Sequence, residues 1–588
     1  MAALFTTPKR NDTTAGTHVA EPDVRRRIGL AHGSWRRVTR RIVAGAVCAL
    51  TVSSLLMPSV SLAAEWVKVG GNKYNTAASD EAGTWSWDGA DDLKLNNYNG
   101  GEIQAAGKLN VNYSGTNIVT AEWIESIKVS HGTNENAELN IQGDEGGTLS
   151  VTSTEDAILS TGNINIDGAG SVNATSTGFD AINAGGDLAI KGSGNVNATG
   201  ASDGIRANGN ITIDDSGAVT ARATKDKGIG ADKNLTIKGG GTVEASSADG
   251  EALWSGGNIN ISDGSQVKAS SEKDAAVEAK GSLAVTNASL DASGVEYGVY
   301  AYKGITLDGA TVTVRTSASG GQAIALITDG DDIVIKNGSI VDAFAEGKFS
   351  VAISTRNHQP NVAGGHIHIS DSVVKAIARY IETGGDGPDH YSNDQSGAVI
   401  PEPRGLNIGI FAQTYEGITP ASISIVRSKL TAEGDTAAIF ALAISEDGKA
   451  IGTIEIEGAP IQTPAGGKII NYRYEEEYGP SISYEAGQTI GTGDATIDSP
   501  YDAAVAKSTV IVPPEETKPE EKPGETKPEG SKSEGTKTTK TVAVAATGAK
   551  IAGKLAATGD ASSAAIVAAT LAGTAAIAVG AVVSRKRS

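Results

Sequence analysis

Cysteine is almost absent from the chain. Cys48 is the only one among 588 residues, and it lies in an N-terminal stretch expected to be removed, so the mature chain would have neither disulfides nor thiol chemistry. Aromatic residues are also scarce, at 4% of the sequence. A wide globular core normally uses more of these bulky side chains. The core is therefore expected to be a narrow tube of alanine, serine, valine and isoleucine.

Positive charge is also in short supply. Residues 1–63 carry a net charge of +6 and residues 559–588 one of +2, so without these segments the net charge falls from −20 to −28. Binding to nucleic acid requires a concentration of lysine and arginine. The composition therefore excludes a nucleic-acid partner and favours a soluble surface protein that attracts cations.

The N-terminal region has the three parts of a secretory signal. Several arginines precede an apolar run over residues 42–60, and small residues follow it up to Ala63. This order predicts export with cleavage after Ala63, which makes residues 1–63 a leader. The arm before the arginines is long for a signal peptide; a later start codon or an extended export signal would each explain it. An N-terminal membrane anchor is the alternative.

A repeat with steps of 22 to 24 residues fills the middle of the chain. Each unit has three short pieces of alternating apolar residues, of the types I-x-A/S, I-x-I and V-x-A, separated by glycine, asparagine and aspartate. The first apolar residue of the unit recurs at Ile158, Ile182, Ile205, Ile229, Leu253, Val277 and Val299. Alternation with period two predicts strands, and no helical period occurs.

Three strands of this length cannot form a sheet within one unit, so they must pair with the neighbouring units. This predicts an all-β fold, a right-handed parallel β-helix with three strands per turn and a period of about 22–25 residues. The uneven step favours the right-handed kind, because left-handed β-helices keep a strict hexapeptide count. The β-helix repeats are expected over residues 137–460, with a projecting loop at 380–405.

Both ends of such a coil need a cover, because an open end exposes the core and unpaired strand edges. Residues 64–136 are expected to form an N-terminal cap and the first turns, with Trp66, Trp85 and Trp87 as the plug. Residues 461–512 are expected to close the other end. The segment 513–554 is rich in Pro, Glu, Lys, Thr and Ala, which is typical of an extended, disordered spacer.

The C-terminal 34 residues, 555–588, contain a short motif, an apolar span and a basic tail. The motif is Leu555-Ala556-Ala557-Thr558-Gly559, the uncharged span 561–583 is long enough to cross a bilayer as a helix, and the basic tail 585–587 would stay in the cytoplasm. This order resembles the sorting signal of sortase substrates in high-GC Gram-positive bacteria, although Ala556 stands where proline is usual. The resemblance implies cleavage between Thr558 and Gly559, covalent attachment to peptidoglycan, and contact with the membrane only before sorting.

The wording of the repeat, as in Asp203-Gly204-Ile205 through Ile213, resembles a bacterial β-helix carbohydrate-binding family described from clostridial cellulose- and pectin-binding proteins. The resemblance covers residues 137–315 well. The segment 83–89 also looks like the opening of large surface proteins from gut actinobacteria. The family implies binding of acidic or neutral polysaccharide without catalysis, with calcium as a companion ion.

Acidic residues precede the recurring apolar position and should stack along one corner of the coil. They are Asp156, Asp180, Asp203, Asp226, Glu251 and Asp274. Carboxylates stacked about 4.8 Å apart repel one another unless a cation intervenes, so the first four are candidate calcium ligands. The alternative is that they are turn formers whose side chains bond their own backbone. A neighbouring column, Asn163, Asp187, Asn210, Asn234 and Asn258, resembles a structural asparagine ladder.

The outward position of the first strand carries the candidate carbohydrate site. Trp254 and Tyr300 should lie two turns apart, about 10 Å, and could stack on sugar rings while Arg206 and Glu278 bind hydroxyl groups. The outward positions of the I-x-I strands are small and uncharged. Incidental surface aromatics are the alternative.

An enzymatic site would instead use the loop at 380–405, where Asp386, Asp389, His390 and Asp394 lie near His366 and His368 in the sequence. The two histidines could bind a metal, but they lack the further ligands of a catalytic zinc site. The leading interpretation is a non-catalytic, adhesin-like surface protein that binds polysaccharide or host glycan and needs no cofactor. The alternatives are a wall-anchored polysaccharide lyase or glycoside hydrolase, and a structural stalk without a ligand.

Overall fold

The computed structural model describes residues 63–130, 137–357 and 365–381 and, beyond them, 407–415, 421–434, 437–444, 452–458 and shorter strand segments up to residue 511. The chain divides into two compact units, residues 1–516 and 517–588, and all described residues belong to the first. Every regular element among the described residues is a strand. None of them forms a helix of the length and apolar character needed to cross a membrane.

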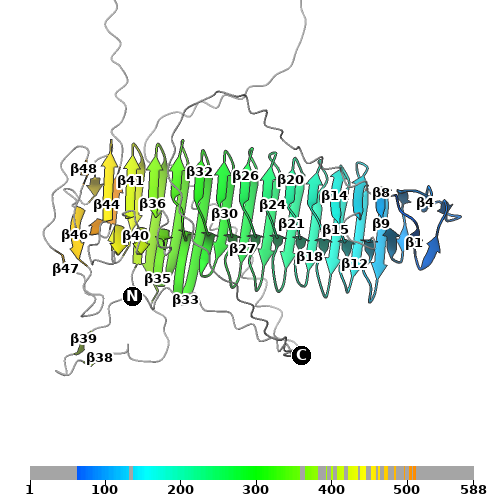
Figure 1. Cartoon of the computed structure of the whole chain (residues 1–588), viewed down its shortest axis with the longest axis horizontal. Coiled ribbons are helices and arrows are strands. Elements are labelled where there is room, and N and C mark those ends of the chain that lie inside the picture. Colours follow the sequence, from blue (N-terminus) through cyan, green and yellow to red (C-terminus); the bar gives the residue numbers. More distant parts are fainter. Residues whose placement is uncertain are drawn as a thin grey trace, which may run out of the picture. The chain divides into compact units, whose positions relative to one another are not determined.

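The strands form three columns, and between residues 92 and 294 each strand pairs in parallel with the strand three places later in the chain (Figure 1). The first column contains β10 (Ile127–Ser130), β13 (Ile158–Ser160), β16 (Ile182–Ala184), β19 (Ile205–Ala207), β22 (Ile229–Ala231), β25 (Leu253–Ser255), β28 (Val277–Ala279) and β31 (Tyr297–Ala301). The second contains β8 (Lys108–Ser114), β11 (Glu138–Gly143), β14 (Asn163–Gly168), β17 (Leu188–Lys191), β20 (Ile211–Asp214), β23 (Leu235–Lys238), β26 (Ile259–Ser262), β29 (Leu283–Thr286) and β32 (Ile305–Asp308). The third contains β9 (Thr116–Ala121), β12 (Thr148–Ser153), β15 (Ser171–Ser176), β18 (Val196–Gly200), β21 (Ala218–Ala223), β24 (Thr242–Ser247), β27 (Gln266–Ser271) and β30 (Ser289–Gly294).

We call one passage through the three columns a winding. The register confirms the sequence repeat: Ile158 pairs with Ile182, Ile182 with Ile205, and the same step continues to Val299. The inward side chains of all three columns are almost fully buried and form one continuous cluster. All-β architecture with long parallel sheets is therefore established, and it is compatible with the predicted β-helix.

The strands of the later windings continue the three columns, and two of them are 18 residues long. They comprise β33 (Thr311–Thr328), β34 (Ile333–Lys336), β35 (Ile340–Asn357), β36 (His366–Ser370), β37 (Val373–Tyr380), β40 (Asn407–Tyr415), β41 (Ala421–Val426), β42 (Lys429–Glu433), β43 (Ala437–Ile444) and β44 (Gly452–Glu457). β33 pairs with β30 of the third column and also with β31 of the first. These long strands therefore run through the corner at which earlier windings have a loop.

Antiparallel pairs occupy the N-terminal end. β1 (Val67–Val69) pairs with β2 (Asn72–Tyr74) and β7 (Ile103–Ala106), while β4 (Trp85–Trp87) pairs with β3 (Ala78–Ser79) and β5 (Asp92–Asn96). Trp85 and Trp87 are buried, whereas Trp66 is half-buried, and the plug formed by these three residues stays a prediction. In the first winding Leu93 of β5 pairs with Val111 of β8. β6 (Asn99–Gly100) pairs with β9.

Antiparallel pairs also occur at the C-terminal end, within the expected cap 461–512. The strands are β45 (Ile461–Thr463), β46 (Ile469–Arg473), β47 (Ser483–Tyr484), β48 (Ala495–Thr496), β49 (Asp502–Val505) and β50 (Ser508–Ile511). β50 pairs with β42, β49 with β43, and β48 with β44. The end of each column thus meets a strand of opposite direction.

Candidate functional site

The predicted acidic corner lies where the third column turns into the first, and three of its acids bond to backbone. Asp156 Oδ1 accepts a hydrogen bond of 3.0 Å from the backbone nitrogen of Asp180, one winding further on. Asp180 in turn accepts one of 2.9 Å from Asp203 N. Each carboxylate thus satisfies a backbone donor of the next winding. This role is structural, like the alternative to calcium, but the bonded backbone belongs to the next winding and not to the acid's own turn.

Burial raises the pKa of these acids. Desolvation is the largest cause for Asp156, whose pKa is raised to about 6, and for Asp203, whose pKa is raised to about 7. The pKa of Asp180 is also raised, again chiefly by burial. Repulsion between successive acids adds to the shift at Asp156 and Asp203, while the backbone hydrogen bonds oppose it. The corner is therefore an electrostatically costly place for three full charges.

The fourth predicted member, Asp226, is not in register with the other three. The next backbone position in the column belongs to Lys227, whose nitrogen donates to Asp203 Oδ1 over 2.7 Å. Asp226 lies one residue earlier and forms an ion pair with Lys227. A lysine thus interrupts the acid stack. Calcium binding stays a prediction, and the contacts of this corner support it less than they support a structural role.

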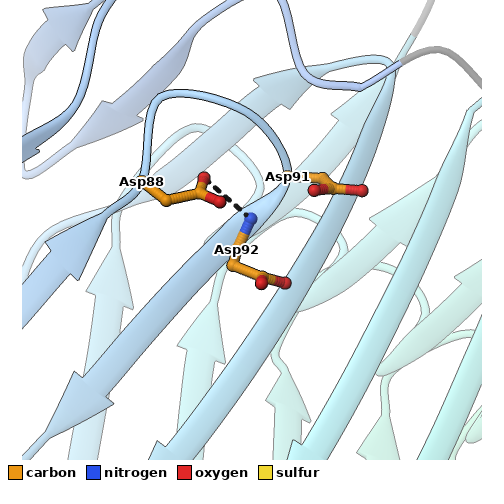
Figure 2. A group of neighbouring side chains, drawn as sticks. All are labelled: Asp88, Asp91 and Asp92. Carbon is orange, nitrogen blue, oxygen red and sulfur yellow. Dashed lines mark hydrogen bonds between the residues drawn. The ribbon is translucent and has the colours of Figure 1, made fainter.

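Among the described residues, another group of three acids lies close together near the N-terminal end. Asp88, Asp91 and Asp92 have carboxylate oxygens within 4.8 Å of one another. Figure 2 shows them around the turn between β4 and β5, where Asp88 Oδ1 accepts a hydrogen bond from Asp92 N. Asp88 also accepts one from Ala90 N, and Asp92 Oδ1 accepts one from Asn110. The hydrogen bonds explain this arrangement as a turn, which sequence analysis did not single out.

The predicted carbohydrate site forms one outward column in the expected register. Arg206 pairs with Gly230, Gly230 with Trp254, Trp254 with Glu278, and Glu278 with Tyr300. We call this column, together with the corner acids and Lys227, the corner band. Arg206 contacts Asp232 over 2.8 Å and lies 3.7 Å from Asp203.

Trp254 is partly exposed and has a cation beside it. The ammonium of Lys227 lies 5.3 Å from the centroid of the Trp254 ring. Gly230 precedes Trp254 by one winding in this column, and a Cβ at Gly230 would lie 2.8 Å from the Lys227 side chain. The absence of a side chain at Gly230 thus gives the Lys227 side chain room beside Trp254.

Glu278 is buried and belongs to a compact polar group. It is hydrogen-bonded to Glu251 and forms an ion pair with Lys280. Burial, followed by the hydrogen bond to Glu278, raises the pKa of Glu251. Lys280 also donates to the hydroxyl of Tyr302 over 2.8 Å and lies 4.0 Å from its ring centroid. The predicted role of Glu278 in binding sugar hydroxyls has to compete with these partners.

Tyr300 is not a surface platform, and this part of the prediction is wrong. Only 5% of the residue is exposed. Its hydroxyl donates to Asp329, and its ring stacks on Tyr302 with centroids 4.5 Å apart. The physical reason is that the outward column becomes apolar in later windings. Tyr300 joins a second buried cluster that includes Ile324, Ile327, Val351, Ile408, Phe411, Ala437 and Phe440.

The asparagine ladder is confirmed. Asn163 Oδ1 accepts a hydrogen bond from Asp187 N, Asp187 Oδ1 from Asn210 N, and the pattern continues through Asn234 and Asn258 to Ser282 N. Beside the ladder, the outward faces of the second column form an open polar groove of about 580 Å³. Its lining includes Asn165, Thr212, Thr236 and Asn260 and contains one cation, Lys191.

The two histidines of the enzymatic alternative lie on β36. His366 Nδ1 lies 2.6 Å from Ser422 Oγ, and its backbone nitrogen donates to Asp332. The loop residues Asp386, Asp389, His390 and Asp394 lie outside the described residues, although β38 (Ser392–Asn393) and β39 (Val399–Ile400) pair in this loop. The sorting motif 555–559 and the span 561–583 also lie outside them. Ala63 is described, and it makes a single bridge with Lys108.

Sequence reasoning missed two exposed aromatic residues beside the acidic corner, Trp123 and Phe179. Both stand in loops, outside the alternating strand pieces on which the search for outward aromatics relied. No protein-family model matches the chain, and no curated protein or solved structure matches it either.

Proposed function

We propose that the protein is a cell-wall-anchored surface protein that displays a right-handed parallel β-helix with three strands per turn. Between residues 92 and 294, the pairing of each strand with the third strand after it supports this fold, and the uneven step of the repeat supports the handedness. After export and removal of the leader, sortase joins Thr558 to peptidoglycan. The span 561–583 holds the chain in the membrane until then, and the segment 513–554 is the wall-crossing spacer.

The displayed coil binds carbohydrate without chemical change. The observation that carries this proposal is the register that places Arg206, Trp254 and Glu278 in one outward column. An indole offers a flat apolar surface on which the C–H face of a sugar ring can stack. The guanidinium of Arg206, two windings away in the same column, can donate hydrogen bonds to hydroxyl groups of the same polymer. The ligand is a polysaccharide of a neighbouring cell, a host or the surroundings.

The geometry of the acid pair beside Trp254 favours binding over hydrolysis at this site; the acids of the 380–405 loop lie outside the described residues. Glycoside hydrolases hold two carboxyl groups about 5–5.5 Å apart when they retain configuration and about 6.5–9.5 Å apart when they invert it. Glu251 and Glu278 are hydrogen-bonded to each other, which is closer than either mechanism uses. The pair has no room for a glycosidic bond between its members.

Retention in native gels that contain polysaccharide tests the proposal. The full-length chain, purified in mild non-ionic detergent, is run through gels with xyloglucan, glucomannan, mixed-linkage β-glucan or polygalacturonate. We expect retention by at least one of them and a loss of ten-fold or more in affinity for Trp254→Ala. Ile340→Ala is the control, because it removes an exposed apolar side chain away from the corner band. Equal retention of the Trp254 variant and the wild type would remove this site.

A further inference from the structure

Trp123 is the most exposed large apolar residue among those that the structure describes, and its backbone is strained. It lies just after β9, with 81% of the residue exposed and a φ of 66°. Bulky residues rarely adopt this left-handed conformation. The backbone nitrogen of Trp123 donates to Thr154 Oγ1 over 2.9 Å, which fixes the turn to the next winding. The fold thus holds an indole in water at a conformational cost, and strain of this kind often marks a functional position.

Phe179 stands at the same corner, two windings further along. It is 51% exposed. A Cβ on the preceding Gly178 would lie 2.2 Å from Thr154 O, so Gly178 lies directly over Thr154. Trp123, in the winding before Thr154, is hydrogen-bonded to the Thr154 side chain. Two windings correspond to about 10 Å along the coil. This is the spacing that the sequence predicted for Trp254 and Tyr300, of which Tyr300 is buried.

The surroundings of the pair are acidic. Glu122 is exposed, and Glu125, Glu155, Asp156 and Asp180 lie in the same corner of successive windings. Lys128 is paired with Glu125. The raised pKa of Asp156, caused mainly by burial, includes repulsion from Glu125 and Asp180. An anionic polymer such as a polyuronate would add charge of the same sign and be repelled. A polymer that offers hydroxyl groups and apolar ring faces would not.

We propose that Trp123 and Phe179 form a stacking site for an uncharged polysaccharide in extended conformation, lying parallel to the axis of the coil. This inference rests on the proposed carbohydrate-binding function and deepens it by naming the class of glycan. The two rings stack on sugar residues two windings apart. Thr154 and Glu155, in the winding between them, supply polar groups that accept hydrogen bonds from sugar hydroxyls.

Retention in the polysaccharide-containing native gels also tests this site, with variants of Trp123 and Phe179. Trp123→Gly and Phe179→Ala each remove one ring, and we expect each to lower the affinity for xyloglucan, glucomannan or mixed-linkage β-glucan at least ten-fold. Glycine accepts a positive φ without strain, so Trp123→Gly should also raise the melting temperature. Loss of binding by a more stable variant cannot come from misfolding. Val373→Ala, which removes an exposed apolar side chain on another part of the coil, is the control and should bind as the wild type does.

The outcomes separate this inference from the function on which it rests. Unchanged affinity of both ring variants overturns the inference, and if Trp254→Ala is weakened at the same time the proposed function stands. Retention on polygalacturonate alone also overturns it, because the ligand would then be anionic. Binding of none of the polysaccharides by the wild type overturns the inference and the proposed function together. Weakening by Trp123→Gly and Phe179→Ala supports the inference whatever Trp254→Ala does.

Discussion

Asp203 Oδ1 accepts a hydrogen bond of 2.7 Å from the backbone nitrogen of Lys227, one winding further along the coil. Only 2% of the residue is exposed. The carboxylate thus joins two windings while its charge is removed from water. The bond itself needs an oxygen acceptor and does not need the charge. Because burying the charge is costly and the hydrogen bond persists without it, protonation of Asp203 should stabilise the fold, and stability at this corner should depend on pH.

The pKa of Asp203 sets the direction of that dependence. Burial raises it to about 7 in the folded chain, against about 3.9 in an unfolded one. Between these pH values the folded chain binds more protons than the unfolded chain, so the free energy of unfolding falls as pH rises from about 4 to about 7. Asp156, with its pKa raised to about 6, adds to the same trend. Urea unfolding of the wild type across this range measures the slope.

Asp203→Asn isolates the effect of the charge. Its amide oxygen can still accept the Lys227 hydrogen bond. We expect the variant to resemble the wild type at pH 4.5 and to be more stable at pH 8 by a few kcal/mol at most. Asp249→Asn, at an exposed residue, is the control and should change stability by about 0.5 kcal/mol or less. A variant that is less stable than the wild type at pH 8 would show that the charge strengthens the corner.

Each hydrogen bond of the asparagine ladder should contribute to the free energy of unfolding. Asn210 accepts a hydrogen bond from Asn234 N and donates one to Asp187. Asn210→Ala leaves the Asn234 nitrogen without this acceptor, so we expect a loss of about 1–3 kcal/mol in the free energy of unfolding. The matched control is Asn260→Ala, at an exposed outward position of the second column. Equal effects of the two substitutions in urea unfolding would contradict a structural role of the ladder.

Glycine beside the ladder should not tolerate a side chain. A Cβ at Gly209 would lie 2.2 Å from Asp187 Oδ1 and 2.8 Å from Gly186 O. Gly209→Ala must therefore push the ladder or the backbone apart, and we expect it to cost about 1–3 kcal/mol. Gly321→Ala should be harmless by comparison, because its nearest neighbour, the Ala318 Cβ, would be 3.7 Å away. Thermal unfolding of the two variants makes the comparison.

The proposed anchor predicts a change of cellular fraction. Thr558→Ala removes the residue at which sortase would cut, so the chain should stay in the membrane through the span 561–583. In a Gram-positive host, muramidase digestion of the wall should release the wild type and leave the variant with the membranes. Thr547→Ala, in a similar sequence without an adjacent apolar span, is the control and should be released as the wild type is. Release of the Thr558 variant into the wall fraction would remove the sortase proposal.

Repetition explains which parts of the fold could be predicted. The inward positions from Ile158 to Val299 recur at nearly constant spacing, and parallel pairing forces equivalent residues into register. The step from Asp203 to Lys227 is 24 residues, whereas Asp226 lies one residue short of it. Counting acids without counting backbone positions therefore placed Asp226 in the stack.

Other features depend on packing that no single repeat reveals. The burial of Tyr300 follows from Ile327 and Phe411, which extend its column in later and longer windings. Trp123 and Phe179 escaped notice because loops follow no alternating pattern. Their exposure is a property of the corner, and only the pairing of successive windings brings the two residues to it.

The antiparallel strands at both ends of the columns also affect whether identical molecules can associate through their sheet edges. A parallel sheet with a bare edge is a template on which an identical chain can add its own strands. At one end β1 lies antiparallel to β7, and at the other end β49 and β50 lie antiparallel to β43 and β42. A chain truncated within the antiparallel strands of either end would expose such an edge and could polymerise into filaments. The antiparallel strands therefore limit the coil to the repeats that lie between them.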